Sequence, residues 1–197
     1  PSPSTLPSPA TLSLGPRTQR DLCRDKFWFF VIGNFIVTTV VFWAYSAILC
    51  VLDNMNLPFL LKYKVQPNEN TPMNKRKFWK AVATVAFNQT VVQIPLSMLA
   101  FPAFENMVDQ TIPNLDTAVM QLAFWVLLEE VAFYYGHRLM HTHYWYSRIH
   151  KIHHEWSAPI GIIALYAHPF EHVVSNLLPA AIGPVLTQGH LGLTWIW

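Results

Sequence analysis

A run of residues without a single charge, residues 27–52, is the feature that most limits how this chain can fold. A helix rises about 1.5 Å per residue, and roughly 20 apolar residues are enough to span the hydrocarbon core of a bilayer. The run is longer than that, and it is too long for the apolar core of a signal peptide. We therefore expect a membrane-spanning helix here.

Two further segments have the apolar character of a membrane span. Residues 81–101 form the weaker one, because several polar residues and a proline interrupt them, and residues 117–135 form the other. Residues 173–186 and 191–197 are apolar again, but prolines and glycines break them, which indicates a kinked or hairpin insertion into the bilayer. The composition agrees, since only 12% of the residues are charged, about half the share that is usual in soluble domains.

The chain divides into two parts by composition. Residues 1–26 begin with a stretch rich in proline and serine that has no apolar periodicity, and we expect them to form a disordered tail. We expect residues 27–197 to form one membrane-embedded domain. The net charge of only +2, with no massed basic patch, argues against a nucleic-acid-binding protein.

The basic residues predict the orientation in the membrane. Residues 53–80 hold six lysines and arginines, whereas residues 102–116 hold three acidic residues and no basic one. The positive-inside rule then places the first loop in the cytosol and the second across the membrane, so the span at residues 117–135 returns to the cytosol. Arg17, Arg20, Arg24 and Lys26 precede the first span and fit this arrangement less well, which leaves the N-terminal topology open.

Six of the nine histidines lie in one short segment directly after the third span. On a helix, residues three and four apart share a face, so His137 and His141 point the same way, as do His150, His153 and His154. Neutral imidazole is a common ligand of iron, zinc and copper. HxxxH alone is a weak signal, but HxxxH followed shortly by HxxHH at the mouth of a membrane span predicts a metal site.

A third motif extends the histidine segment to residues 137–172. His168 and His172 are again four apart, and Pro169 suits the first turn of a helix between them. Together these features predict an all-α integral membrane protein. We expect a bundle of about three to four transmembrane helices with a cytosolic, histidine-rich, metal-binding cap.

Other polar residues near the histidines have two interpretations. Glu130 lies on the same helical stripe as His137, so we expect it to orient a ligand imidazole by a hydrogen bond. The alternative is that Glu129 and Glu130 only mark the end of a span. His143 and His190 are interpreted as polar residues of the membrane interface.

The three motifs resemble those of a known family. EEVAFYYGHRLMH at residues 129–141, HKIHH at 150–154 and AHPFEH at 167–172 are similar to the fatty acid hydroxylase superfamily of integral-membrane non-heme di-iron oxygenases, and most of all to its sterol C4-methyl oxidase branch. The resemblance is close over roughly the second half of the chain. It implies that the iron ligands are His137, His141, His150, His153 and His154, with His168 and His172 as further ligands or as partners of the ligands.

The resemblance also implies a chemistry. Two iron ions would use O2 as co-substrate to oxidise a C–H bond of a lipid, either a sterol 4-methyl group or a fatty acyl chain, in sterol or lipid biosynthesis. The implied location is the endoplasmic reticulum membrane, with the histidines facing the cytosol. Electrons would come from a b-type cytochrome and an NAD(P)H-dependent reductase.

One departure from the family pattern limits these expectations. The family carries another HxxHH near its C-terminus, and this sequence has no second HxxHH. We therefore expect residues 27–197 to be a C-terminally incomplete hydroxylase domain, and the 197 residues alone to be inactive. The alternatives are a desaturase on the same metal platform and a catalytically inactive membrane scaffold. A zinc peptidase is excluded, because no HExxH is present.

Overall fold

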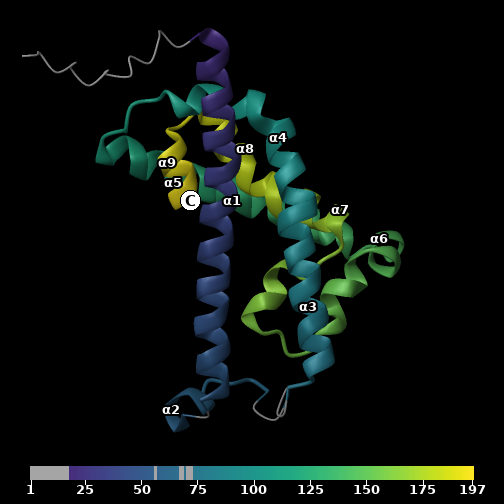
Figure 1. Cartoon of the computed structure of the whole chain (residues 1–197). Helices are drawn as coiled ribbons and strands as arrows, with labels where there is room; N and C mark the ends of the chain where they lie inside the picture. Colours follow the sequence, from purple (N-terminus) through teal and green to yellow (C-terminus); the bar gives the residue numbers. More distant parts are fainter. Residues whose placement is uncertain (1–17, 56, 67–68, 70–72) are drawn as a thin grey trace, which may run out of the picture.

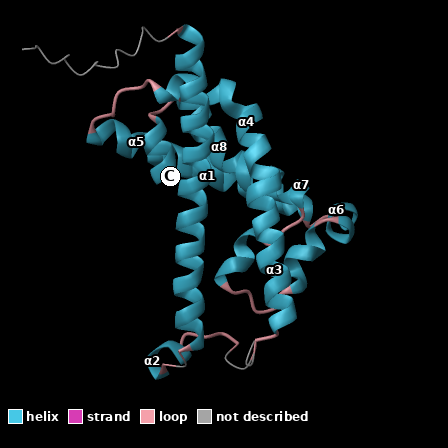
Figure 2. Ribbon diagram, in the orientation of Figure 1, coloured by secondary structure: helices cyan, strands magenta, loops and turns pink. Residues whose placement is uncertain are grey.

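The computed structural model describes residues 18–55, 57–66, 69 and 73–197, and within these residues the chain is helical with no strand (Figure 2). The α-helices are α1 (Gln19–Asn54), α2 (Pro58–Leu61), α3 (Lys75–Phe87), α4 (Gln93–Phe104), α5 (Leu115–Met140), α6 (His143–Arg148), α7 (Pro169–Glu171), α8 (Leu178–Thr187) and α9 (Leu191–Ile196). The tighter 3-10 helices are η2 (Glu105–Val108), η3 (His150–Glu155) and η4 (Gly161–Leu165), and the wider π-helices are η1 (Asn88–Val92) and η5 (His172–Leu177).

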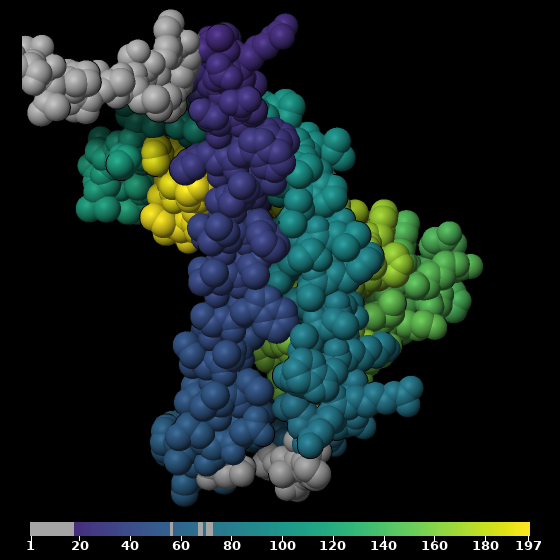
Figure 3. All heavy atoms as spheres, in the orientation of Figure 1, coloured from purple at the N-terminus to yellow at the C-terminus, as the bar shows by residue number. Residues whose placement is uncertain are grey.

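Three helical runs in this part of the chain are long and apolar enough to cross a membrane: Gln19–Asn54, Lys75–Val108 and Leu115–Met140. The first run is exposed over most of its length, and its exposed side chains are largely apolar, as expected of a helix that faces lipid. α1 lies along the run from α3 to α4, and the segment around α6 projects at the side (Figure 3). The expected all-α membrane bundle is confirmed.

The first helix begins earlier than the sequence predicted. Residues 1–17 of the expected tail lie outside the described residues, but Gln19 onward is already helical, so the predicted boundary at residue 26 is wrong. The cause is a capping box. The Thr18 hydroxyl accepts a hydrogen bond from the Asp21 backbone N–H, and the Asp21 carboxylate accepts one from the Thr18 backbone N–H, both at 3.2 Å.

The second span contains the polar residues that weakened its prediction, and these residues are buried and engaged. The Asn88 side-chain amide donates to the backbone carbonyls of Leu165 (3.2 Å) and Ala167 (2.9 Å), and Gln89 accepts a hydrogen bond from the Trp43 indole N–H (2.7 Å). Asn88 and Gln89 begin the π-helix η1, and such wide turns occur often near functional sites. The interruption of the span therefore ties it to α1 and to the segment after the histidines.

The two predicted loops lie at opposite ends of α1 (Figure 1). Near the N-terminal end, Lys26 forms an ion pair with Asp109 of the connection between α4 and α5. Near the other end, Lys64 pairs with Asp53 at 2.8 Å. The two loops thus lie on opposite sides, as the charge pattern predicted. Which of the two sides is cytosolic stays a prediction.

Within the described residues, the C-terminal helices pack against α5 as a short reversal. Trp125 of α5 is fully buried, and its indole N–H donates to the Thr187 hydroxyl at 2.9 Å. Gly183 allows this contact, because a Cβ atom there would lie 2.6 Å from the Trp125 ring. α8 then ends at Gln188, which has a left-handed backbone (φ 47°), and α9 turns back.

The topology can be checked by glycosylation mapping in eukaryotic cells. Val108→Thr creates an acceptor at Asn106, and the pair Tyr63→Asn and Val65→Thr creates one at position 63, where both native side chains are exposed. We expect modification at position 106 and none at position 63, because the basic loop stays cytosolic. The reverse pattern would contradict the orientation, and modification of both would contradict the single crossing between them.

Candidate metal centre

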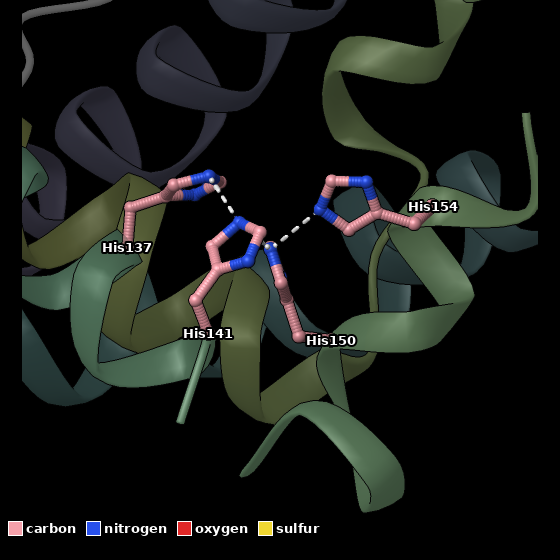
Figure 4. Close-up of side chains that lie close together, drawn as sticks. All are labelled: His137, His141, His150 and His154. Atoms are coloured by element: carbon pink, nitrogen blue, oxygen red, sulfur yellow. Dashed lines mark hydrogen bonds between the residues drawn. The ribbon is translucent and has the colours of Figure 1, made fainter. Parts of the chain in front are cut away.

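Four imidazoles converge where α5 ends (Figure 4). His137 comes from the last turns of α5, His141 follows its last residue, and His150 and His154 come from η3. The Nε2 atom of His141 lies 3.1 Å from that of His137 and 3.1 Å from that of His150, and the Nε2 atoms of His150 and His154 are 2.9 Å apart. One ring nitrogen from each of the four lies within 4.8 Å of the others, so the set could hold a metal ion.

The local chain path explains this convergence. α5 ends at Met140, and the Thr142 hydroxyl donates to the Leu139 carbonyl at 2.8 Å where the chain leaves the helix. The short helix α6 then turns the chain back, so that η3 meets the end of α5. Figure 4 shows the four rings reaching one point from these two directions.

His153 does not bring a nitrogen atom to this group of four. Its Nδ1–H donates to the backbone carbonyl of Tyr166 at 3.2 Å, and its ring stacks on that of His150 at 5.6 Å between centroids. Spacing along η3 does not explain this difference; the hydrogen bond to Tyr166, 13 residues further along the chain, holds the His153 ring instead. His153 instead lines a neighbouring cavity of about 400 Å³ together with His137, Glu129 and Glu171. Its role as a ligand stays a prediction.

A buried carboxyl group orients one of the four imidazoles. Glu171 Oε1 lies 2.5 Å from His150 Nδ1, and both side chains are almost completely buried. With Nδ1–H donating to Glu171, the Nε2 lone pair of His150 faces His141 and His154. Such carboxylate–imidazole pairs fix the tautomer and the ring orientation of metal-binding histidines.

The expected role of Glu130 is therefore not supported. Glu130 is exposed, and its side chain hydrogen-bonds to none of the described histidines. Although Glu130 and His137 lie on one helical stripe, only His137 reaches the group of four, and the adjacent Glu129 lines the cavity beside His137. The orienting carboxyl group is supplied by Glu171, which the sequence reasoning missed although it lies inside the HPFEH motif.

The surroundings favour the neutral form of His150 and His154. Burial lowers the pKa of His150 to about 3, and the nearby rings of His137 and His154 act in the same direction. Burial, and then His141 and His153, also lower the pKa of His154. Burial raises the pKa of Glu171 to about 7. Neutral imidazoles keep the lone pairs that a metal ion requires.

The other two predicted histidines differ in their surroundings. His168 caps α7, because its Nδ1 accepts the backbone N–H of Phe170 at 3.2 Å. His172 is fully buried, and neither of its ring nitrogens has a hydrogen-bond partner among the described residues. Burial lowers its pKa to about 4. Both stay predicted ligands, and His172 keeps both ring nitrogens available.

A polar network fixes the histidine segment to the second span. Lys80 forms an ion pair with Glu155 at 2.8 Å, and the Tyr166 hydroxyl donates to the same carboxylate at 2.6 Å. Burial alone would raise the pKa of Glu155, but the hydrogen bonds from Lys80 and Tyr166 hold it below its ordinary value. Since the Tyr166 carbonyl also accepts from His153, this network sets the position of η3.

The two histidines interpreted as interface residues lie apart from the group of four. His143 is exposed at the start of α6. His190 caps α9, where its Nδ1 accepts the backbone N–H of Gly192 at 3.0 Å.

Comparisons with known proteins agree with the motifs. The sequence model of the fatty acid hydroxylase family matches residues 122–197. The chain is 40% identical over 177 residues to fatty acid hydroxylase domain-containing protein 2 of Homo sapiens (87% of this chain, 53% of that protein). It is 32% identical to methylsterol monooxygenase 2-1 of Arabidopsis thaliana (84% and 60%), and 31% identical to very-long-chain aldehyde decarbonylase GL1-11 of Oryza sativa subsp. indica (88% and 68%).

The chain spans about half the length of the first of these relatives. No solved structure matches the chain. The resemblance inferred from the histidine motifs is confirmed by the relatives.

The role of Glu171 can be tested by metal content in the full-length protein. We expect Glu171→Ala to weaken metal retention by about 10- to 100-fold, because His150 loses the group that fixes its ring. Glu171→Gln should be milder, since its side-chain carbonyl still accepts from Nδ1–H. The control is Glu130→Ala, which should retain metal like the wild type. Equal losses in Glu171→Ala and Glu130→Ala would contradict the assignment.

The group of four can be tested separately by comparing two exposed histidines. We expect His154→Ala to lower bound metal by about tenfold or more, because one of four converging nitrogens is lost. His143→Ala should leave metal content unchanged, since it lies outside the group. Elemental analysis after dialysis measures both, and a similar loss in the two variants would show that the group is assigned wrongly.

Proposed function

The chain belongs to the fatty acid hydroxylase family, and from this we propose that it is part of a membrane-bound non-heme di-iron oxygenase that uses O2 to oxidise a C–H bond of a lipid. The observation that carries the proposal is the group of four imidazoles at the end of a membrane-spanning helix. Four imidazoles, with no cysteine and no carboxylate among them, suit an ion such as iron.

The donor set fits a metal ion in the way the proposal requires. His137, His141, His150 and His154 would hold one iron, and His153 and His172 would contribute to the second. The bound iron ions would supply the activation of O2 for attack on the C–H bond. The chain's own residues prepare the site: Glu171 holds the His150 tautomer, and the Tyr166 carbonyl holds that of His153.

The substrate in this proposal is a sterol 4-methyl group or a fatty acyl chain. Support comes from the relatives, one of which is named a methylsterol monooxygenase. Another relative is named a very-long-chain aldehyde decarbonylase, which makes a long-chain aldehyde a further substrate to test. The two alternatives to this proposal are a desaturase that uses the same histidines and a catalytically inactive membrane scaffold.

The proposal includes a location and electron donors. The endoplasmic reticulum membrane, with the histidines on the cytosolic side, would let a b-type cytochrome and an NAD(P)H-dependent reductase reach the site. Arg148 and Lys151 are exposed on either side of the turn into η3 and would favour an acidic partner. The Lys80–Glu155 ion pair supports a common membrane side for the basic end of α3 and the histidines.

Product analysis with labelled oxygen tests the proposal. Full-length, iron-loaded protein in lipid nanodiscs receives b-type cytochrome, reductase and NADPH, and then a 4-methylsterol, a fatty acid or a long-chain aldehyde. We expect an oxidised product that carries an atom from ¹⁸O₂, and a loss of about 100-fold or more in His150→Ala, which removes a buried ligand. Tyr144→Phe, an exposed change, is the control. An unlabelled alkene would indicate a desaturase, and no product from iron-loaded protein would favour a scaffold.

A further inference from the structure

A cavity of about 560 Å³ lies between α1, α4, α5, α8 and α9, apart from the group of four imidazoles. Its volume falls in the range of small-molecule sites, roughly 300–1,000 Å³. Most of its wall is apolar, with Phe30, Leu96, Leu177 and Trp195 among the lining residues. Because α1, α4 and α5 belong to the candidate membrane spans, this cavity lies within the apolar bundle.

One side of the cavity carries a polar strip from α1 and α4. Asn34 donates to the Ser97 hydroxyl at 3.2 Å, and the Gln93 side-chain amide donates to the Thr38 hydroxyl at 2.8 Å. These bonds hold the strip in place and use only part of its capacity. Among the described residues, neither the Ser97 hydroxyl hydrogen nor the Gln93 side-chain carbonyl has a partner, so the strip offers one donor and one acceptor.

α9 contributes Thr194 and Trp195 to the wall, with their polar atoms turned away from the cavity. The Thr194 hydroxyl oxygen and the Trp195 indole nitrogen are buried and have no hydrogen-bond partner within the described part of the chain. Buried polar groups are normally paired, and an unpaired one costs about 1–3 kcal/mol. Both atoms are covered by protein, so the polar contacts to a ligand come from the strip of α1 and α4.

The charge of the wall limits which ligand fits. The lining residues include no lysine, arginine or histidine, and their one ionisable group is Glu129. A carboxylate or phosphate head group inside an apolar bundle needs a cation or several charge-assisted bonds. A hydroxyl group needs only one donor and one acceptor, which the strip supplies.

The cavity adjoins the histidine site. Glu129 lines both this cavity and the smaller one beside His137 and His153. The turn from η5 into α8 also forms a wall of both, since Ser175 and Asn176 line the smaller cavity and the next two residues line the larger. The two cavities thus share part of a wall, and the smaller one lies between the larger cavity and the histidines His137 and His153.

We propose that this cavity binds an uncharged lipid with a hydroxyl or carbonyl group, whose oxygen is held by Ser97 and Gln93, in preference to an ionised fatty acid or a phospholipid. The inference rests on the proposed function in one respect, because it takes this lipid to be the substrate. Binding itself requires only the cavity, so it can be measured without turnover.

Photo-labelling of the full-length protein tests the proposal. The probes are a long-chain alcohol with a diazirine group in the chain and the fatty acid of the same length and label, each applied to chelator-treated protein in detergent at pH 8. We expect the alcohol to label peptides of α4 or α9 at concentrations about tenfold lower than the acid requires. Equal labelling by the two probes, or labelling only elsewhere, would overturn the proposal.

Two matched pairs of variants test the residues. Ser97→Ala should weaken alcohol binding about fivefold, as expected for one lost hydrogen bond, whereas Ser46→Ala, at an equally buried serine outside the cavity, should not. Ala100→Trp should fill the cavity and abolish labelling, whereas Ala83→Trp, at an exposed position of α3, should not. Unchanged metal content in each variant shows that the fold is kept. No difference within either pair would contradict the proposal.

The outcomes separate this inference from the proposed function. Alcohol binding that depends on Ser97 and Ala100, without oxidation by iron-loaded protein, would leave the cavity assigned and reject the oxygenase. Oxidation of a lipid that is insensitive to both substitutions would support the oxygenase and reject the cavity.

Discussion

The buried contact between His150 and Glu171 is the interaction on which the histidine group depends. It joins η3 to α7, and the Nε2 atom that it orients lies within 3.1 Å of the Nε2 atoms of His141 and His154. Both side chains are almost fully buried, so each gives the other a hydrogen-bond partner that water cannot supply. If Glu171 is replaced, His150 stays buried but its tautomer and ring orientation are no longer fixed. Its Nε2 atom then no longer has a fixed position relative to those of His141 and His154.

The bilayer explains why the polar residues of the second span serve the site. In hydrocarbon, an unpaired amide is costly, so polar side chains in a span need partners within the protein. Asn88 finds them in the carbonyls of Leu165 and Ala167, just before the HPFEH motif, and Gln89 finds one in Trp43. These polar residues make residues 81–101 a weak span by sequence. In the structure they attach the second span to α1 and to the segment just before the HPFEH motif.

The sequence could predict the features that depend on local pattern, and it failed where long-range contacts decide. Apolar length predicted the spans, and spacing predicted that His137 and His141 converge with His150 and His154. The turn of His153 toward the Tyr166 carbonyl depends on a contact across 13 residues, which spacing does not reveal. The choice of Glu171 over Glu130 needs a contact across 21 residues, and no helical stripe contains it.

The residues that line the larger cavity include no positively charged side chain, and this limits which lipids the helix bundle can bind. The Glu129 carboxyl group does not supply the missing positive charge: ionised, it repels a carboxylate, and protonated, it offers only a single neutral donor. The strip of Ser97 and Gln93 adds neutral partners only. A lipid that enters from the bilayer therefore meets no group that would hold an ionised head, and its orientation is set by one or two hydrogen bonds and by shape. Such weak polar anchoring suits a site that must place a C–H bond beside the histidines, because the apolar wall then decides which carbon lies nearest to them.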